Sequence, residues 1–187
     1  MSARLVFTVL LMFLISCSEK EPEKDTASEG TYFSIMQFAK DQWDTHKGQP
    51  FGIKKTVYLD GAADSTVTNA FELDWAPILK VFFETDISDK KFIGQYNFSA
   101  FRGVDEKTNG FYYEAKNPKL YTKKLQITAH DVTGKIQSIY IEAGKSDRMG
   151  SKNLKLFYTP LSSITIQEME TSRTGQKKEL RVVYEIL

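Results

Sequence analysis

Three basic side chains gather in the short stretch 144–153, which reads Gly-Lys-Ser-Asp-Arg-Met-Gly-Ser-Lys-Asn. Lys145, Arg148 and Lys152 could together hold an anion, because ammonium and guanidinium groups form charge-assisted hydrogen bonds with phosphate or carboxylate oxygens. The spacing is not that of a nucleotide-binding loop, in which Gly-Lys-Ser/Thr follows a first glycine after four residues. The stretch therefore indicates a weak anion-binding site, and a plain connection between two strands is the simpler interpretation.

Two histidines, His46 and His130, could bind a metal or transfer a proton. Two separate histidines cannot form a three-histidine zinc site, and no His-Glu-x-x-His motif is present. His46 falls at the end of an expected helix, where a histidine often interacts with the last carbonyls. His130 precedes Asp131 at an expected turn, and neighbours along a strand point to opposite faces. We therefore expect neither a zinc site nor a His-Asp proton relay.

Acidic side chains cluster at Glu84, Asp86 and Asp89. The sequence 86–91 lacks the alternating oxygen ligands, the glycine and the distal glutamate of an EF-hand calcium loop. A helix end that runs into a solvated turn is the simpler interpretation. A pair of carboxylates at glycosidase spacing stays open, because the fold sets that distance rather than the sequence interval. No cofactor is expected from these patterns.

Cys17 is the single cysteine of the 187-residue chain, and an apolar segment precedes it. The segment runs from Leu5 to Ile15 with Thr8 as its one polar residue, and Arg4 comes just before it. A basic residue followed by a short apolar run is typical of a secretory signal peptide. The run is short for a membrane span, which needs roughly 20 apolar residues. A short transmembrane anchor is the alternative.

The end of this segment, Leu14-Ile15-Ser16-Cys17, resembles the lipobox of bacterial lipoproteins. The resemblance implies that a diacylglyceryl group is attached to the Cys17 sulfur and that residues 1–16 are cleaved off. A free cysteine in an ordinary signal peptide is the alternative. Since no other cysteine follows, a lipidated Cys17 leaves the exported domain without a disulfide, a thiol nucleophile or a cysteine metal ligand.

Residues 18–30 hold five acids, two bases and no aliphatic residue larger than Ala27. Such a segment cannot offset its ordering entropy by burial, so residues 17–30 are expected to form a lipidated, disordered tether. An acidic stretch after the cysteine resembles the export signal of surface-exposed lipoproteins in the Bacteroidota, and Ser18 resembles outer-membrane sorting in other bacteria. These resemblances imply a lipid-anchored protein of the cell envelope, at the outer membrane, on its periplasmic or its outer side. A solvated linker without an address function is the alternative.

The charge of the remaining chain is nearly balanced, with 22 bases and 19 acids in residues 31–187. Residues 116–187 are more basic, with 13 bases and 7 acids, but the lysines there alternate with apolar residues. This alternation is typical of the solvated face of a sheet, whereas a nucleic-acid binder has a denser basic stripe. We therefore expect no nucleic-acid partner.

Helical spacing of apolar residues predicts two helices. The first is expected to begin at the cap Thr31 and to run to about His46, with a core face of Tyr32, Ile35, Met36, Ala39 and Trp43. The second is expected to begin at the cap Asp74, with Pro77 in its first turn. Its core stripe is Trp75, Ile78, Leu79, Phe82 and Phe83.

Alternation with period two predicts strands through most of the rest, separated by turn signals such as Asp60-Gly61, 131–134 and 172–175. The expected strands are 51–60, 96–100, 111–116, 125–129, 139–141, 164–169 and 180–186. Consecutive short strands of this kind form an antiparallel meander. The sequence therefore predicts a single α+β domain, residues 31–187, with a curved sheet of about seven to eight strands and both helices packed on one face.

The segment 55–61, Lys-Thr-Val-Tyr-Leu-Asp-Gly, together with Asp74-Trp75 and Thr85-Asp86-Ile87, resembles small uncharacterised lipoproteins of the Bacteroidota. A curved antiparallel sheet on helices is also similar to the lipoprotein-carrier folds of the envelope, at the level of fold alone. Neither resemblance implies an activity.

Aromatic residues make up 13% of the chain, which is more than a core of this size must hold. An aromatic-lined groove on the sheet would suit an apolar ligand or an extended peptide. The leading hypothesis is therefore a membrane-anchored, non-enzymatic binding or accessory module for a protein partner or an apolar ligand. The alternatives are an envelope hydrolase, acting through a carboxylate pair or through His130 with a serine, and a structural component of an outer-membrane assembly.

Overall fold

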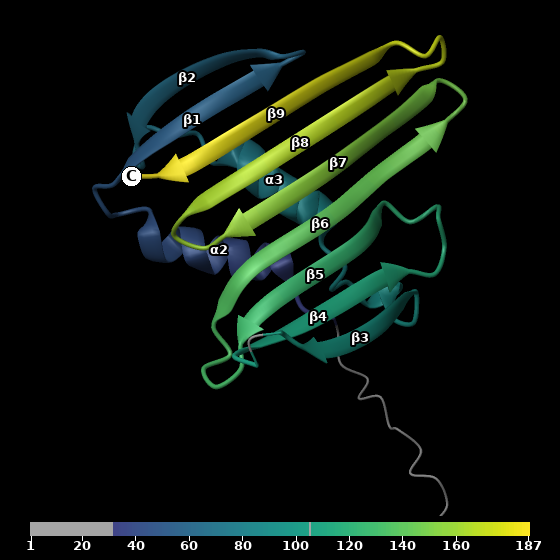
Figure 1. The fold of residues 1–187 in the computed structure, drawn as a ribbon, viewed down its shortest axis with the longest axis horizontal. Helices are drawn as coiled ribbons and strands as arrows, with labels where there is room; N and C mark the ends of the chain where they lie inside the picture. Colours follow the sequence, from purple (N-terminus) through teal and green to yellow (C-terminus); the bar gives the residue numbers. More distant parts are fainter. Residues whose placement is uncertain (1–31, 105) are drawn as a thin grey trace, which may run out of the picture. The chain divides into compact units, whose positions relative to one another are not determined.

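The computed structural model describes residues 32–104 and 106–187, all of which belong to one compact unit. These residues form an α+β fold with two α-helices and one open antiparallel sheet of nine strands, as Figure 1 shows. The helices are α2 (Ile35–His46), α3 (Ala76–Thr85) and the short 3-10 helix η2 (Lys90–Phe92). The strands are β1 (Gly52–Leu59), β2 (Ala62–Asn69), β3 (Tyr96–Arg102), β4 (Thr108–Ala115), β5 (Thr122–His130), β6 (Ile136–Asp147), β7 (Gly150–Thr159), β8 (Ser163–Ser172) and β9 (Lys177–Ile186).

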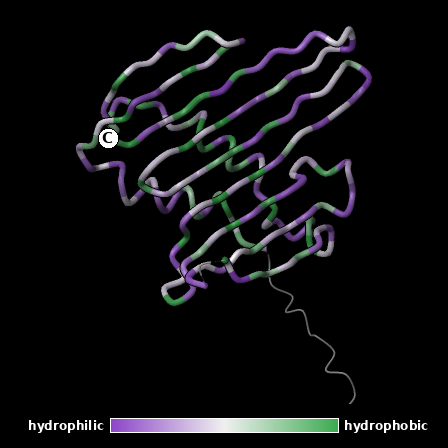
Figure 2. The backbone as a smooth tube through the Cα atoms, in the orientation of Figure 1, coloured by the Kyte–Doolittle hydropathy of each residue, from purple (hydrophilic) through white to green (hydrophobic). Residues whose placement is uncertain are grey.

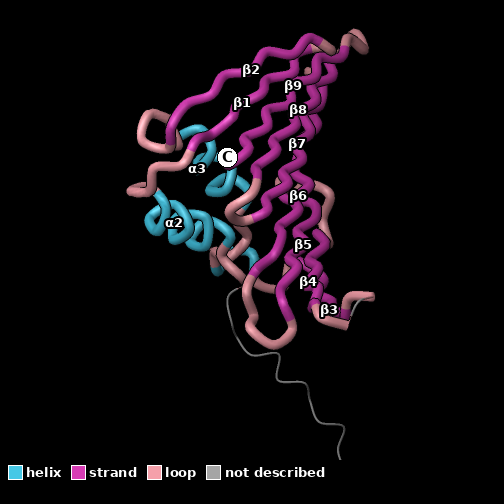
Figure 3. The backbone as a smooth tube through the Cα atoms, turned by 60° about the vertical axis from the view of Figure 1, so that its left-hand side comes forward, coloured by secondary structure: helices cyan, strands magenta, loops and turns pink. Residues whose placement is uncertain are grey.

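The order of strands across the sheet explains where the helices lie. It is β2-β1-β9-β8-β7-β6-β5-β4-β3, so β3 to β9 form a meander and the β1–β2 hairpin pairs beside β9. β2 and β3 are therefore the two edges, and the chain between them must cross the whole sheet. α3 lies in this crossing, and Figure 3 shows both α-helices on the same face of the sheet. We call this the covered face, and the opposite one the open face.

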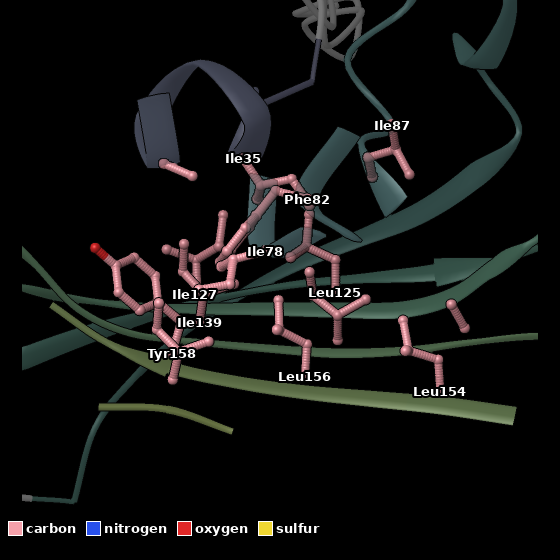
Figure 4. Packing of buried hydrophobic residues seen from close by; sticks show 14 of the residues in the cluster. Ile35, Ile78, Phe82, Ile87, Leu125, Ile127, Ile139, Leu154, Leu156 and Tyr158 are labelled. Atoms are coloured by element: carbon pink, nitrogen blue, oxygen red, sulfur yellow. The ribbon is translucent and has the colours of Figure 1, made fainter. Parts of the chain in front are cut away.

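The core lies between the helices and the covered face (Figure 4). In the central strands every second side chain is buried: Leu125, Ile127 and Ala129 in β5, Ile139, Ile141 and Ala143 in β6, and Leu154, Leu156 and Tyr158 in β7. From the helices, Ile35, Ile78 and Phe82 are at most 1% exposed. Figure 2 shows the same alternation as changes of hydropathy along the strands. The period-two pattern of the sequence thus reports one buried and one solvated face.

The α+β class, the antiparallel sheet and the two helices are confirmed, but the predicted strand number of seven to eight is wrong. The prediction lacks two strands, β7 and β2. β7 was missed although Leu154, Leu156 and Tyr158 alternate along it. β2 reads Ala-Ala-Asp-Ser-Thr-Val-Thr-Asn and is exposed over most of its length, so no apolar alternation reveals it. It forms because the turn Asp60-Gly61, with φ values of 47° and 92°, folds the chain back onto β1.

Both α-helices begin slightly differently from the prediction. Ser34 caps α2, because its Oγ accepts a hydrogen bond from Gln37 N at 3.1 Å, whereas the expected cap Thr31 lies outside the described residues. α3 begins at Ala76, so the expected cap Asp74 lies two residues before the helix. Asp74 Oδ1 still accepts a hydrogen bond from the Ala76 N–H at 3.0 Å. Phe83, predicted as core, is 67% exposed. The buried stripe of α3 is therefore narrower than its apolar stripe.

Candidate functional site

Two tryptophans hold the end of α2 against the start of α3. Their rings, Trp43 in α2 and Trp75 just before α3, have centroids 4.2 Å apart at an interplanar angle of 35°. The indole N–H of Trp75 donates to the carbonyl of Ala70 at 3.2 Å, which ties this ring to the end of β2. The end of α2 and the start of α3 are therefore joined by a tilted aromatic pair.

An apolar pocket lies beneath this pair, and we call it the inner pocket. It encloses about 50 Å³. The helix side supplies Ala39, Gln42, Trp43, His46, Trp75, Ile78, Leu79 and Phe82, and the sheet side with its connections supplies Phe51, Ile53, Tyr158, Leu161, Ser163, Ile164, Tyr184 and Ile186. This volume has room for about four water-sized groups. It is far smaller than a typical drug-sized site of roughly 300–1,000 Å³, so it fits one side chain or the end of a hydrocarbon chain.

One polar atom in the wall has no partner. Nδ1 of His46 is buried and forms no hydrogen bond within the described residues. The ring sits at the end of α2, with its centroid 6.4 Å from that of Phe51. A buried polar atom left without a partner costs about 1–3 kcal/mol. His46 is therefore the lining residue that gains most from a ligand with one hydrogen-bonding group, which Nδ1 would meet once the ring turns toward the pocket.

Two tyrosines of the sheet, Tyr158 and Tyr184, also line the inner pocket. Burial raises the pKa of Tyr158 to about 12. Burial also raises the pKa of Tyr184, and the negative charge of Asp74 adds to this effect. Both hydroxyls therefore stay neutral at physiological pH, so the pocket carries no tyrosinate that would repel an anionic or favour a cationic ligand.

Leu161, in the β7–β8 turn, is a partly exposed residue of the inner pocket's lining. It has a φ of 59°, in the left-handed region that a leucine rarely adopts, and its side chain is 50% exposed. Such a backbone conformation costs about 1 kcal/mol or more and persists where the surroundings enforce it. The turn thus holds an apolar side chain that lines the pocket and is also accessible to solvent.

A second opening, the outer groove, lies on the other side of α3. It has a volume of about 190 Å³ and is lined by Pro77, Ile78, Val81, Ile166, Glu168, Leu180, Val182 and Tyr184. Ile78 and Tyr184 line both spaces and form the wall between them. α3 therefore contributes side chains to two neighbouring spaces, the inner pocket and the outer groove.

The predicted anion site lies elsewhere, because the stretch 144–153 is a hairpin rather than a loop. Lys145 in β6 is the direct cross-strand partner of Lys152 in β7, whereas Arg148 lies in the turn between them. The two lysines line an open, polar depression of about 500 Å³ that Arg148 does not line. The structure thus brings two of the three bases together.

Lys152 already has acidic partners. Its Nζ lies 2.7 Å from Glu168 Oε2 and 3.5 Å from Glu170 Oε1. The hydrogen bond with Glu168 is the main reason that the pKa of Lys152 is raised above its ordinary value. The positive charge of this depression is therefore largely balanced from within the sheet, which disfavours it as an anion site.

His130 lies at the end of β5, far in sequence from the inner pocket. Its Nδ1 is 3.3 Å from Asp131 Oδ1, closer than expected, because Asp131 already belongs to the turn rather than to the strand. The same Nδ1 accepts hydrogen bonds from the backbone N–H groups of Val132 and Thr133 at 3.3 and 3.4 Å. A proton relay requires an Nδ1–H that donates to the carboxylate, so this arrangement holds the turn instead.

The acidic cluster 84–89 contains one structural carboxylate. Asp86 Oδ2 accepts hydrogen bonds from Ser34 Oγ at 2.7 Å and from Met36 N at 2.8 Å, and Oδ1 accepts from Ser88 N at 2.6 Å. The residue that ends α3 therefore caps the N-terminus of α2. This contact, rather than a solvated turn, fixes how the two helices sit over the inner pocket.

Cys17, the expected signal peptide and the acidic tether lie outside the described residues. Within 32–104 and 106–187, no group of three or more His, Asp and Glu side chains could hold a metal ion. None of the helices in these ranges is long and apolar enough to cross a bilayer.

No protein-family model matches the chain, and no curated protein matches it significantly. The function must therefore be argued from the site itself.

Sequence reasoning identified many pocket residues as core and missed that they surround a space. Trp43, Trp75 and Leu79 lie on the predicted apolar stripes. In the sheet-side wall, Leu161 and Ser163 come from the β7–β8 connection and the start of β8, which carry no periodic pattern. One signal was present: both tryptophans of the chain fall near helix ends that the same prediction placed on one sheet.

Proposed function

We propose that this chain is a lipid-anchored protein of the bacterial envelope, whose domain is a non-enzymatic binding module for an apolar ligand with one polar group. The observation that carries the proposal is the inner pocket, a mostly apolar space lined by His46, whose buried Nδ1 has no hydrogen-bond partner among the described residues. Burial of apolar surface would supply most of the affinity, and the histidine would set the position of the polar group.

A linear hydrocarbon chain is the ligand shape that fits best. The inner pocket has room for a few methylene or methyl groups, and the outer groove of about 190 Å³ runs along the other side of α3. Ile78 and Tyr184 line both spaces, so a chain that reaches past these two side chains would contact the inner pocket and the outer groove together.

The location of the protein rests on sequence features. The lipobox-like Leu14-Ile15-Ser16-Cys17 supports lipid attachment at Cys17, and the acidic segment 18–30 supports sorting to the outer membrane. A single lipidated residue at the N-terminus would place the ligand-binding domain next to a supply of acyl chains. Retention of Cys17→Ser in the membrane fraction would contradict the anchor.

The two tryptophans provide a direct measurement, because both line the inner pocket and the chain has no others. Normal alcohols of increasing length, titrated into the exported chain carrying Cys17→Ser, should change the tryptophan emission. We expect affinity to rise about fourfold with each added methylene, from about 0.8 kcal/mol per buried CH₂, and then to level off when the pocket is full. No change of emission with any member of the series would contradict the proposal.

His46→Phe tests the polar part of the site, with His130→Phe as the matched control. His46→Phe removes the buried unpartnered atom, so we expect the fold to gain about 1–2 kcal/mol of stability. It should weaken the binding of alcohols relative to alkanes of equal length, whereas His130→Phe should leave both unchanged. An equal loss of alcohol binding in both variants would remove His46 from the site.

Ala39→Leu tests the space itself, with the exposed Ala63→Leu in β2 as its control. Ala39 lines the inner pocket and is 6% exposed, so a leucine there would fill it. We expect alcohols to lose their effect on tryptophan emission in Ala39→Leu alone. Unchanged binding in a folded Ala39→Leu protein would show that the ligand binds elsewhere.

A further inference from the structure

The β3 edge of the sheet exposes apolar side chains on both of its faces. Phe98 is 56% exposed and lies on the covered face, with its ring 5.0 Å from that of Tyr113. Phe101 is 48% exposed on the other face, where its ring lies over Gly110 of β4. β3 has no strand on its outer side, and Arg102 at its end is its only charged residue. Edge strands are usually protected by charges, prolines or bulges, so this edge is unusually apolar.

Nearby turns extend this apolar surface. Ile93 precedes β3 and is 48% exposed, and Val104 follows it and is fully exposed, at 106%. Val132 in the β5–β6 turn is 83% exposed. The backbone hydrogen bond from Asp131 N to Lys107 O, 2.9 Å long, holds that turn beside the β3–β4 turn. Four segments of the chain thus contribute exposed apolar groups to one end of the sheet.

The two edges of the sheet also differ in charge. Residues 88–119, which contain β3, β4 and their flanks, hold six bases and four acids. Residues 60–75, which contain β2 and its flanks, hold four acids and no base. Figures 1 and 3 show β2 and β3 at opposite ends of the sheet. The apolar end is therefore also the basic end, which is the combination that binds the surface of an anionic bilayer.

The chain enters the domain at this same end. Tyr32, the first described residue, has its ring 5.8 Å from Tyr96 in β3 and 5.5 Å from Tyr113 in β4. Its hydroxyl accepts a hydrogen bond from Gly94 N at 2.9 Å. Thirteen residues, 18–30, separate Cys17 from Thr31, and such a segment reaches at most about 45 Å. An anchor at Cys17 would therefore be attached nearer to the β3 edge than to the β2 edge.

We propose that the β3 edge rests on the surface of an anionic phospholipid bilayer, with Phe98, Phe101, Val104 and Val132 among the head groups and the β2 edge turned away. This inference rests on the proposed lipid anchor. The anchor raises the effective concentration of lipid at the domain, so a contact that is weak by itself is populated. The acidic segment 18–30 is repelled by anionic head groups, which leaves the contact to the basic edge.

Three single-cysteine variants of the lipidated chain, in which Cys17 is blocked by its acyl group, test this orientation. Val104→Cys and Val132→Cys place a fluorophore at the β3 end, and Val67→Cys places it on β2, where the native valine is 68% exposed. The proteins are reconstituted in vesicles of phosphatidylethanolamine and phosphatidylglycerol that contain nitroxide-labelled lipid. We expect several-fold stronger quenching at positions 104 and 132 than at 67, decreasing at high salt. Equal quenching at the three positions would overturn the proposal.

Charge reversal supplies the second measurement. Lys90→Glu with Lys91→Glu should reduce quenching at position 104 several-fold, whereas Lys177→Glu with Lys178→Glu, at the far end of the sheet, should not. A competing outcome is a second copy of the chain on β3. The fluorophore at 104 would then be shielded from water but not quenched by the labelled lipid, and a spin label at the same position would couple between molecules. That result would overturn the membrane contact. Flotation of the same vesicles distinguishes the lipid anchor from the membrane contact of the β3 edge. Protein that does not float with the vesicles lacks the anchor. Protein that floats but shows no quenching at position 104 has the anchor and lacks the contact.

Discussion

The two faces of the sheet are built from alternate residues of the same strands, and they use those residues differently. On the covered face, Leu125, Ile141 and Leu156 are completely buried beneath the helices. On the open face, side chains stand in rows of cross-strand pairs, such as Tyr140 and Phe157, whose ring centroids are 4.6 Å apart. Phe157 remains 48% exposed. Side chains of the covered face are therefore removed from water, whereas side chains of the open face contact their cross-strand neighbours and remain partly exposed to solvent.

The two faces should therefore contribute differently to the stability of the fold. The covered face holds the core and the inner pocket in one layer, so the groups that would bind a ligand are also those that hold the helices to the sheet. The open face carries pairs such as Lys124 and Glu142, 3.5 Å apart, and Arg181 over the ring of Tyr58, at 4.1 Å. Pairs exposed in this way each contribute about 1 kcal/mol or less. Substitutions should therefore be costly on one face and mild on the other.

The largest expected difference is between two phenylalanines. Phe82 of α3 is 1% exposed, and its ring lies 5.4 Å from that of Tyr158. Truncation to alanine would leave a cavity beside the inner pocket, so Phe82→Ala should lower the free energy of unfolding by about 3–5 kcal/mol. Phe157→Ala, the matched change on the open face, should cost about 1 kcal/mol. Urea unfolding measures both values, and similar losses would mean that the open face is also covered in solution.

A smaller difference is expected between two aspartates of the helix layer. Asp86 accepts hydrogen bonds from Ser34 and Met36 at the start of α2, whereas the exposed Asp89 caps the 3-10 turn through Lys91 N at 2.9 Å and pairs with Lys91 Nζ at 3.1 Å. Asp86→Asn removes a negative charge from a helix N-terminus and one acceptor, which should cost about 1–2 kcal/mol. Asp89→Asn should cost about 0.5 kcal/mol or less. Thermal unfolding of both variants decides this, and a larger loss in Asp89→Asn would contradict the bridging role of Asp86.

The covered face was largely predictable from the sequence, because burial imposes periodicity. Ile78 and Phe82 follow helical spacing, and Leu125 and Ile127 follow strand spacing, so both patterns point to one core. β2 was missed for the opposite reason. It is an exposed edge whose side chains need no apolar alternation, and its pairing with β1 is carried by backbone hydrogen bonds that the sequence does not display.

The candidate site was less predictable, because a pocket is a property of what the core leaves empty. The prediction placed Trp43 and Trp75 on apolar stripes, but their 4.2 Å stacking depends on how α3 crosses the sheet. That crossing follows from the position of β3 at the edge opposite β2, which only the full strand order reveals. The role of Asp86 was hidden for the same reason, since its partners lie about 50 residues away.

The smallest expected effect is a pH dependence on the open face. Glu142 Oε1 accepts a hydrogen bond from the Tyr140 hydroxyl at 2.5 Å, and this bond, with the charge of Lys124, lowers the pKa of Glu142 from its ordinary value of 4.5. A carboxylate whose pKa is lower in the folded state stabilises the fold above pH 4.5, and that contribution is lost as the pH falls through the folded pKa. The same contact and burial raise the pKa of Tyr140, so its hydroxyl remains a donor throughout this range.

Glu142→Gln should therefore cost about 1 kcal/mol at pH 7 and nothing once the pH is well below 4.5, since the native carboxyl is then also neutral. Unfolding measured between pH 3 and 7 gives the difference directly. Glu114→Gln, an exposed carboxylate across from Lys124 on the same face, is the control and should show a smaller dependence. If Glu142→Gln still lowers the free energy of unfolding at low pH, the contact between Tyr140 and Glu142 depends on packing rather than on the charge of the carboxylate. The open face would then resemble the covered face more closely than its exposure suggests.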